Sequence, residues 1–371
     1  MIERLLEQKI LHRLNKGKAI IVIGPRQVGK TTLINSILEN REHLFLDGDD
    51  STVRNLLTNP NTEQLKSIIG NYTTIFIDEA QRIENIGLTL KIIADQFKHV
   101  QLLVSGSSAF ELNNQTCEPL TGRKWDYKLY PISWQELENH IGYIKSEQQL
   151  ELRILYGMYP DVINNLGDEV EVLKELTNSY LYKDILAFSG IRKPLVLEKL
   201  LRALALQIGS EVSYNELAQL VGVDKNTVGN YIDILEKGYV IFRLTSFSRN
   251  LRNEIKTNQK IYFYDTGVRN AIIGNFNALD SRNDTGGLWE SFLLSERIKK
   301  LTYEGSLANG YFWRTKQQQE IDYVEEVSGN IRGYEFKWNP KAKSKFPKSF
   351  METYDTEIKI IHRDNFREFV M

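Results

Sequence analysis

The spacing of apolar residues divides the chain into stretches with different periodicity. Up to about residue 140, runs rich in β-branched residues alternate with helical patterns, and these runs lie at 19–24, 43–49, 73–79 and 100–108. Because the runs are apolar at nearly every position, we expect strands of a parallel sheet that helices cover on both faces. The pattern therefore predicts an α/β domain over residues 1–140.

Three further parts are predicted after this domain. Residues 141–195 have a helical pattern rich in Leu, Tyr and Glu, which indicates a helical lid. Residues 196–265 combine two helices, a short turn and basic strands, as a winged helix-turn-helix does. Residues 266–371 mix one strong helix with strands and predict a C-terminal α/β domain. Within it, the Asn, Asp, Ser and Gly content of residues 277–287 predicts a flexible loop.

Composition narrows the class of protein. Hydrophobic residues make up 42% of the 371 positions and charged residues 26%, as in ordinary globular proteins. The formal net charge of -1 argues against a uniformly basic nucleic-acid binder but allows basic patches on single domains. The single cysteine, Cys117, excludes an intramolecular disulfide and favours a reducing compartment. No apolar run reaches the roughly 18 residues of a membrane span, so we expect a cytoplasmic protein with no membrane contact.

A phosphate-binding motif lies between the first predicted strand and the helix after it. The sequence "GPRQVGKTT" at 24–32 matches G-x-x-x-x-G-K-[ST] in the strand-to-helix context that this motif requires. Glycines let backbone N–H groups surround phosphate oxygens, and Lys30 is expected to reach the β- and γ-phosphates of ATP. We expect the Thr31 hydroxyl to bind Mg²⁺. The predicted nucleotide-binding residues are Gly24, Pro25, Arg26, Gln27, Val28, Gly29, Lys30, Thr31 and Thr32.

Two carboxylates end the strand "IFIDE" at 75–79. Asp78 fits the aspartate on the magnesium side of a P-loop site, and Glu79 fits a base that orients the attacking water. Acidic residues also often simply begin the next helix, so the pair alone is weak. After a P-loop, at the distance of one α/β unit, it favours ATP hydrolysis.

Ser105 and Arg123 are further candidates in this domain. Ser105 ends the strand "LLVSG" and is predicted to lie between the two phosphate-binding elements, although a Ser-Gly turn is also common punctuation. Arg123 follows a glycine, and its guanidinium suits a γ-phosphate of a neighbouring subunit. An arginine in a surface ion pair is an equally good interpretation of this position.

The motifs "GPRQVGKTT", "IFIDEAQRI", "LLVSGSS" and "LTGR…LYPISWQEL" together resemble a family of bacterial and archaeal AAA-type ATPases. These proteins carry a C-terminal restriction-endonuclease-like domain. The resemblance covers nearly the whole chain and implies an AAA-type ATPase core, a winged-helix middle and a nuclease-like end. One departure is Ser105, which occupies the sensor region where a longer polar side chain such as Asn is usual.

The middle part carries the signals of a DNA-binding module. An apolar face is predicted from Leu217, Leu220, Val223, Val228, Ile232 and Leu235. Polar groups for groove contacts are expected on the second helix, at Lys225, Asn226, Thr227 and Asn230. Basic residues for phosphate contacts follow on the wing, at Arg243, Arg249, Arg252, Lys256 and Lys260. The alternative is a winged helix that only packs between domains.

The end of the chain carries a possible metal-dependent nuclease site. In "GYEFKW", Glu335 and Lys337 share one face of a strand, and a hairpin is expected to bring Asp322 beside them. Glu290, on the preceding helix, completes a carboxylate set for Mg²⁺ or Mn²⁺. The pattern Glu…Asp…Glu-x-Lys resembles the PD-(D/E)XK nuclease motif. By itself, however, E-x-K is common on any solvated strand.

These features predict an ATP-hydrolysing, DNA-binding enzyme whose C-terminal domain cuts DNA, with branched DNA and processed ends as candidate substrates. Arg123 acting between subunits would require a homo-oligomer, with a hexamer as one candidate. The alternative is a nucleotide-switched DNA-binding regulator or scaffold with an inactive nuclease fold. An RNA-directed role also stays open, because phosphate contacts do not distinguish the two polymers.

Overall fold

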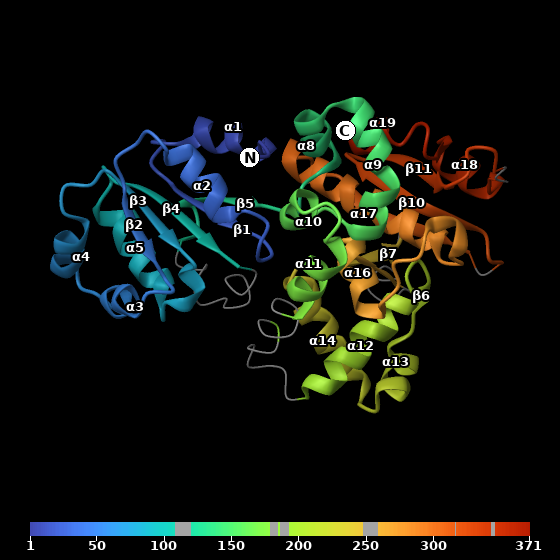
Figure 1. Cartoon of the computed structure of the whole chain (residues 1–371), viewed down its shortest axis with the longest axis horizontal. Helices are drawn as coiled ribbons and strands as arrows, with labels where there is room; N and C mark the ends of the chain where they lie inside the picture. The colour runs from blue at the N-terminus through green and yellow to red at the C-terminus, as the bar shows by residue number, and fades with distance from the viewer. Residues whose placement is uncertain (108–119, 179–184, 186–192, 248–258, 316, 343–345) are drawn as a thin grey trace. The chain divides into compact units, whose positions relative to one another are not determined.

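The computed structural model describes residues 1–107, 120–178, 185, 193–247, 259–315, 317–342 and 346–371 (Figure 1). Contacts within the chain group them into two compact units. The first unit comprises Met1–Ile132 and Lys237–Tyr239, and the second comprises Ser133–Glu236 and Val240–Met371. The four-domain division stays a prediction beside this grouping.

The first unit is built on one parallel sheet in the order β2-β3-β4-β1-β5. Its strands are β1 (Ala19–Ile23), β2 (Leu44–Asp47), β3 (Thr74–Asp78), β4 (Gln101–Gly106) and β5 (Lys124–Lys128). Its helices are α1 (Leu5–Arg13), α2 (Lys30–Leu38), α3 (Ser51–Leu57), α4 (Thr62–Ile69), the 3-10 turn η1 (Ala80–Arg82) and α5 (Ile86–Gln96). The predicted parallel α/β sheet is confirmed.

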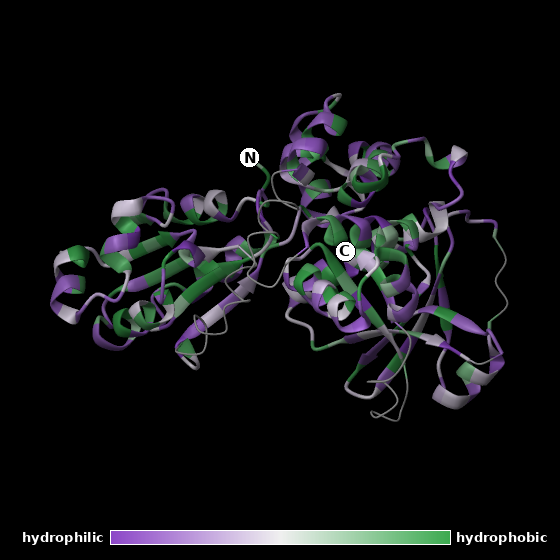
Figure 2. Ribbon diagram, turned by 90° about the horizontal axis from the view of Figure 1, so that it is seen from below, coloured by the Kyte–Doolittle hydropathy of each residue, from purple (hydrophilic) through white to green (hydrophobic). Residues whose placement is uncertain are grey.

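Burial explains why the central strands of the first unit, β1, β3 and β4, are almost continuously apolar. Every residue of β1 and of β4 is buried, and the green colour of the central strands in Figure 2 follows the same pattern. Ile21, Ile77 and Val104 lie in one core cluster with residues of α4 and α5. The order of the strands brings the carboxyl ends of β1, β3 and β4 to the same edge of the sheet, where polar residues follow each strand.

The second unit contains a mixed sheet in the order β12-β11-β10-β9-β7-β8-β6. β7 pairs antiparallel with β8 and parallel with β9, so strands on both sides of the predicted boundary at residue 265 belong to one sheet. Its strands are β6 (Glu211–Val212), β7 (Ile241–Ser246), β8 (Gln259–Phe263), β9 (Asn309–Arg314), β10 (Glu320–Val327), β11 (Asn330–Phe336) and β12 (Ile358–Ile361).

Helices of the second unit pack through a buried aromatic cluster. Trp134, Trp289, Phe292 and Phe366 are each at most 1% exposed, and their rings meet edge-on or stacked.

None of the helices among the described residues is long and apolar enough to span a membrane. The helices are α8 (Trp134–Ile141), α9 (Tyr143–Tyr156), α10 (Pro160–Asn164), α11 (Glu169–Leu176), α12 (Pro194–Leu206), α13 (Tyr214–Val221), α14 (Lys225–Lys237), α16 (Thr266–Ile273), the 3-10 turn η4 (Leu279–Ser281), α17 (Thr285–Glu304), α18 (Lys348–Tyr354) and α19 (Arg367–Val370).

The helix pair α13–α14 forms where the sequence predicts it, with one correction to its apolar face. Leu220 is 64% exposed, whereas Val221 is buried beside Leu217. The interior face of this short helix therefore follows the i, i+4 spacing, and position 220 turns to solvent. Gly222 ends α13 in the left-handed conformation, with φ 75°.

The segment 277–287, predicted to be flexible, is anchored by a network of charges. Asp284 Oδ2 lies 2.6 Å from Arg269 Nη1, and Asp284 Oδ1 lies 2.7 Å from Arg282 Nε. The Arg282 guanidinium also donates to the carbonyl of Asn275 at 2.6 Å. Burial opposes ionisation of Asp284, but the hydrogen bonds from Arg282 and Arg269 outweigh it and lower the pKa to about 2. The composition of the segment did not predict this anchoring, because the partners are brought together by tertiary contacts.

Asp284 should stabilise the second unit most above pH 4. A carboxylate whose pKa is lower in the folded than in the unfolded chain contributes stability that is lost as pH falls through the folded pKa. Between pH 5 and pH 2, we expect the free energy of unfolding of wild type to fall by about 2 kcal/mol more than that of Asp284→Asn. Urea unfolding at both pH values measures this difference. Asp280→Asn, at an exposed position nearby, is the control. A difference in unfolding free energy between wild type and Asp284→Asn that is the same at both pH values would contradict the prediction.

Candidate functional site

The loop after β1 has the backbone geometry of a phosphate cradle. Gly29 precedes α2 in the left-handed region with φ 89°, and Gln27 has φ 59°. A Cβ at Gly24 would lie 2.0 Å from the carbonyl oxygen of Leu129, so glycine is required there for packing. The successive turns leave the amino end of α2 beside the loop, where its N–H groups favour an anion.

Lys30, the first residue of α2, lies within this loop. Its ammonium donates to the carbonyl oxygens of Gly24 at 3.1 Å and Pro25 at 2.8 Å, and the side chain is buried. Val28 is buried as well, whereas Thr32 is exposed and Arg26 is half-buried. The loop and its lysine therefore form one compact structure.

Asp78 connects three elements at the carboxyl edge of the sheet. The Thr31 hydroxyl donates to Asp78 Oδ2 at 2.7 Å, and the Ser105 hydroxyl donates to Asp78 Oδ1. Both Asp78 and Ser105 are buried. The structure thus brings together the Thr31, Asp78 and Ser105 side chains that the sequence singled out. A hydroxyl and a carboxylate side by side are oxygen donors that suit Mg²⁺.

Glu79 has a strained backbone and a partner that the sequence reasoning missed. Its φ of 47° and ψ of 39° lie in the left-handed region, which is uncommon for a residue with a side chain. Gln81 donates from Nε2 to Glu79 Oε2, while Gln81 Oε1 accepts from the Ser107 N–H at 3.1 Å. Gln81 therefore orients Glu79 and ties it to the end of β4. Its position two residues after Glu79 was the available signal.

Arg123 lies at the amino ends of the strands, whereas the phosphate loop lies at their carboxyl ends. Its carbonyl accepts from the N–H of Ala19, the first residue of β1, and its guanidinium pairs with Asp95. The loop follows the last residue of β1, roughly 13 Å along the strand. Both partners of the ion pair are about 40% exposed. Within its own subunit, Arg123 therefore forms a surface ion pair away from the phosphate loop.

Arg4 is a second residue that the sequence reasoning missed. Its guanidinium donates to the carbonyl of Val28 in the loop and to the carbonyl of Tyr130, each at 2.6 Å. The side chain is 7% exposed. Charge-assisted hydrogen bonds of this kind fix backbone positions strongly. Arg4 therefore holds the outer side of the loop against the chain that follows β5.

The predicted DNA-binding residues divide into exposed and paired groups. On α14, Lys225, Asn226 and Asn230 are exposed. Arg243 instead pairs with Glu236 and with Asp233. Lys260 is buried among carboxylates. Arg249, Arg252 and Lys256 lie outside the described residues, as does Cys117.

The E-x-K strand forms a hairpin with the strand that carries Asp322. Tyr323 pairs with Tyr334 in the β10–β11 register, so Asp322 lies opposite Glu335. Asp322 Oδ2 accepts from the N–H of Phe336 at 2.7 Å, and Lys337 Nζ lies 2.8 Å from Glu335 Oε1. The hairpin thus brings the two carboxylates and the lysine together, as the spacing predicts.

Glu290, on α17, turns toward strand β8. Its Oε2 accepts from the Tyr262 hydroxyl at 2.8 Å and lies 3.9 Å from Lys260 Nζ. Lys260 Nζ in turn lies 2.5 Å from Glu320 Oε1. Lys260 and Tyr262 share one face of β8, a period-2 signal that could have linked them. We refer to Glu290, Glu320, Asp322, Glu335, Lys260 and Lys337 as the acidic cluster.

The acidic cluster has oxygen donors suited to Mg²⁺ or Mn²⁺, but it is not assembled as predicted. Burial and then the charges of Glu290 and Glu335 raise the pKa of Asp322 to about 8, a strain that a cation would relieve. Among the residues that the structure describes, however, no three acidic, histidine or cysteine side chains are grouped to hold a metal ion. Asp322 and Glu335 lie opposite each other and could supply two oxygen ligands, with Glu335 also paired to Lys337, whereas the predicted third ligand, Glu290, is held by Tyr262 and Lys260.

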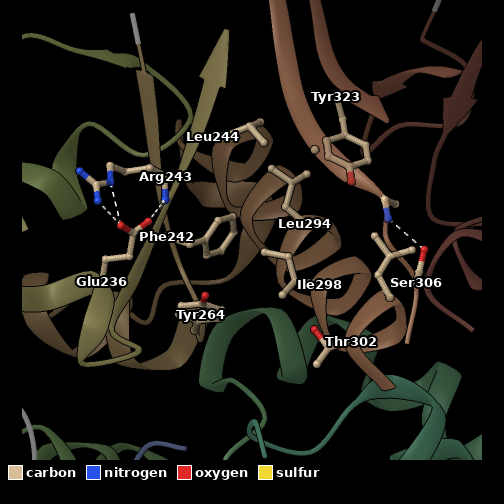
Figure 3. Close-up of a pocket in the computed structure, with 13 residues that line it drawn as sticks. Glu236, Phe242, Arg243, Leu244, Tyr264, Leu294, Ile298, Thr302, Ser306 and Tyr323 are labelled. Atoms are coloured by element: carbon tan, nitrogen blue, oxygen red, sulfur yellow. Dashed lines mark hydrogen bonds and ion pairs between the residues drawn. The ribbon is translucent and has the colours of Figure 1, made fainter. Parts of the chain in front are cut away.

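A cavity of about 310 Å³ lies elsewhere in the second unit, between α17 and strands β7, β9 and β10 (Figure 3). Phe242, Leu294 and Ile298 give it an apolar wall. Three of its polar side chains are engaged already, because Arg243 pairs with Glu236 and the Tyr323 hydroxyl donates to Glu325 at 3.3 Å. We assign this cavity no role.

Three family descriptions match successive parts of the chain. Residues 16–138 match the family described as "AAA domain". Residues 147–279 match "Domain of unknown function (DUF8612)", and residues 285–368 match "Domain of unknown function (DUF4143)". The predicted boundary at 140 lies between the first two matches, whereas those at 195 and 265 fall within the second match.

Similar proteins occur in bacteria and archaea. An uncharacterized protein of Mycobacterium tuberculosis is 28% identical over 334 residues, which cover 89% of this chain and 72% of that protein. An uncharacterized protein of Methanocaldococcus jannaschii is 21% identical over 344 residues, which cover 86% of this chain and 75% of that protein.

Among solved structures, the Walker-type ATPase of Pyrococcus abyssi aligns with a TM-score of 0.50 and 15% identity. The alignment covers 73% of this chain and 96% of that one, and at this identity it shows a shared fold. Its fold agrees with the match of residues 16–138 and with the phosphate loop that Lys30 closes. The chain therefore carries a P-loop ATPase domain of the AAA type.

Proposed function

We propose that the protein hydrolyses ATP at the loop of residues 24–32 and engages DNA with its second unit, where the acidic cluster is a nuclease-like centre. The observation that carries the first part is the hydrogen-bonded set of Thr31, Asp78 and Ser105 beside Lys30. These groups come from the ends of β1, β3 and β4, where open α/β sheets bind ligands.

The residues of the loop have separable roles in this proposal. Backbone N–H groups from Gly24 to Thr32 bind the phosphates, and Lys30 binds the β- and γ-phosphates. Thr31 and Asp78 would hold Mg²⁺, which would neutralise charge on the phosphates. Glu79, oriented by Gln81, positions the attacking water. Ser105 keeps Asp78 in place.

Arg123 acts in this proposal on the γ-phosphate of a neighbouring subunit. Its position at the far edge of its own sheet supports action only in trans, because it lies beside Ala19 and not beside the loop. Asp95 must release the guanidinium on assembly; because both side chains are half-exposed, that ion pair costs little to break. ATP hydrolysis would then depend on a homo-oligomer, such as a hexamer.

DNA engagement is supported by the arrangement around α13 and α14. The order α12, β6, α13, α14, β7, β8, with β8 paired to both β6 and β7, is that expected of a winged helix. Lys225, Asn226 and Asn230 are exposed on the second helix of the pair, where a groove-reading helix carries its contacts.

A nuclease-like role for the acidic cluster is supported by Asp322, Glu335 and Lys337, which the β10–β11 hairpin gathers. Asp322 and Glu335 would hold a divalent ion there, which would supply polarisation of a phosphodiester and activation of water, and Lys337 would balance charge on the phosphate. The second candidate is a nucleotide-switched regulator or scaffold with an inactive centre. It is favoured by the partners of Glu290, which is held by Tyr262 and Lys260.

Removing the Lys30 ammonium should abolish ATP turnover. We expect Lys30→Ala to lower kcat by about a hundredfold or more, because the charge developing on the phosphates loses its main protein cation. Phosphate release from purified protein with Mg²⁺ measures this. Lys98→Ala, an exposed lysine of the same unit, is the control. Turnover that persists in Lys30→Ala would disprove the assignment of the loop.

Removing the Arg4 guanidinium should weaken ATP binding without unfolding the first unit. We expect about a tenfold rise in the Kd for a fluorescent ATP analogue, since the carbonyl of Val28 loses its anchor. Arg13→Ala is the matched control on the same N-terminal segment, because Arg13 stacks on Trp125, 4.1 Å from the ring centre. Equal affinity in Arg4→Ala and wild type would exclude a role for Arg4 in holding the loop.

The acidic cluster is tested by cleavage of linear, single-stranded and branched DNA with Mg²⁺ or Mn²⁺. We expect Asp322→Ala/Glu335→Ala to reduce cleavage to background while ATP turnover stays at the wild-type rate, because the two sites use different residues. Cutting that survives this double substitution would sink the nuclease assignment. If wild type binds every DNA without cutting it, the regulator or scaffold is the better description.

A further inference from the structure

Lys260 is an unusual lysine, because its ammonium is buried inside the acidic cluster. The side chain is 2% exposed. Nζ lies 2.5 Å from Glu320 Oε1 and 3.9 Å from Glu290 Oε2, and 5.5 Å from the centre of the Phe312 ring. An isolated ammonium would not stay charged in such a place, because burial strongly disfavours the ionised form.

The neighbouring carboxylates compensate for this burial. Burial lowers the pKa of Lys260, but Glu290, Glu320 and Asp322 outweigh it and raise the pKa above its ordinary value. Arg314 adds a positive charge on the other side of Glu320, with its Nε 3.5 Å from Glu320 Oε2. The cluster is therefore held together by cations that belong to the chain itself.

Glu290 shows the consequence of this arrangement. Its carboxylate is engaged by the Tyr262 hydroxyl and faces the Lys260 ammonium, both from strand β8. Asp322 and Glu335 lie opposite each other in the β10–β11 hairpin, where Asp322 accepts from the Phe336 N–H and Glu335 pairs with Lys337. Asp322 is still close enough to stabilise the charge of Lys260. The direct partners of the three carboxylates are thus divided, because Glu290 is held from β8 and the other two within the hairpin.

We propose that Lys260 is a built-in cation of the acidic cluster, which occupies the position at Glu290 that a divalent metal ion would otherwise take. Lys260 was predicted to contact a DNA phosphate from the wing. Because its ammonium is buried among carboxylates, we assign it to charge compensation in the acidic cluster instead. A divalent ion then binds only at Asp322 and Glu335; this second statement rests on the proposed nuclease-like function.

Counting bound Mn²⁺ tests the proposal without relying on activity. The full chain with Asp78→Ala, which removes the carboxylate beside the ATP loop, is titrated with MnCl₂, and free Mn²⁺ is measured by electron paramagnetic resonance. Adding Lys260→Met should raise the number of bound ions by one per chain, because Glu290 and Glu320 lose their cation. Adding Glu290→Gln as well should remove the extra ion.

Two comparisons guard the interpretation. Lys359→Met, at an exposed position of β12, should leave the number of bound ions unchanged. Since unpaired buried carboxylates destabilise a fold, the melting temperature of the Lys260→Met chain is also measured with and without Mn²⁺. We expect Mn²⁺ to raise it more than in the Asp78→Ala chain. A Lys260→Met chain that Mn²⁺ neither binds nor stabilises would overturn the proposal.

The number of ions in the chain that retains Lys260 distinguishes the two ideas. One ion there and one more in Lys260→Met support both the built-in cation and a metal-dependent centre. No ion with Lys260 but one without it supports the built-in cation and argues against metal-dependent cleavage. The same number in both chains overturns the role of Lys260, whatever that number is.

Discussion

In the first unit a single carboxylate, that of Asp78, accepts hydrogen bonds from Thr31 and Ser105, and the three groups come from different elements. This contact exists only because β3 and β4 are neighbours in a parallel sheet and β1 is next in order. Parallel strands end at one edge, so polar residues placed after each strand converge there. The hydrophobic residues of the strands thus determine where the site forms.

The second unit depends on a different constraint, the continuity of its sheet. β7 pairs with β9, and this pairing joins strands from the predicted wing to strands from the predicted nuclease-like end. As a result, Lys260 and Tyr262 on β8 come within reach of Glu290 on α17. Charge compensation in the acidic cluster therefore joins residues on both sides of the domain boundary that the sequence predicts at residue 265.

Buried charges recur in this unit, each with a partner. Arg297 pairs with Glu325 at 2.8 Å, and Lys299 pairs with Glu296 of the same helix at 2.6 Å. The N–H of Trp134 donates to Glu296 at 2.6 Å, which ties α8 to α17. Such pairs add little net stability, but removing one partner leaves an uncompensated charge. They therefore favour one arrangement of the helices over its alternatives.

Local features of the chain were predictable from sequence. The phosphate loop depends on Gly29, whose positive φ is a local property, and the shared face of Glu335 and Lys337 follows from strand geometry alone. The parallel sheet of the first unit was predictable too, because its strands must be apolar on both faces. Tertiary structure alone decided that Arg123 lies far from its own loop, that Leu220 faces solvent and that Lys260 lies among carboxylates. Each of these depends on which strands and helices become neighbours, and no spacing along the chain contains that information.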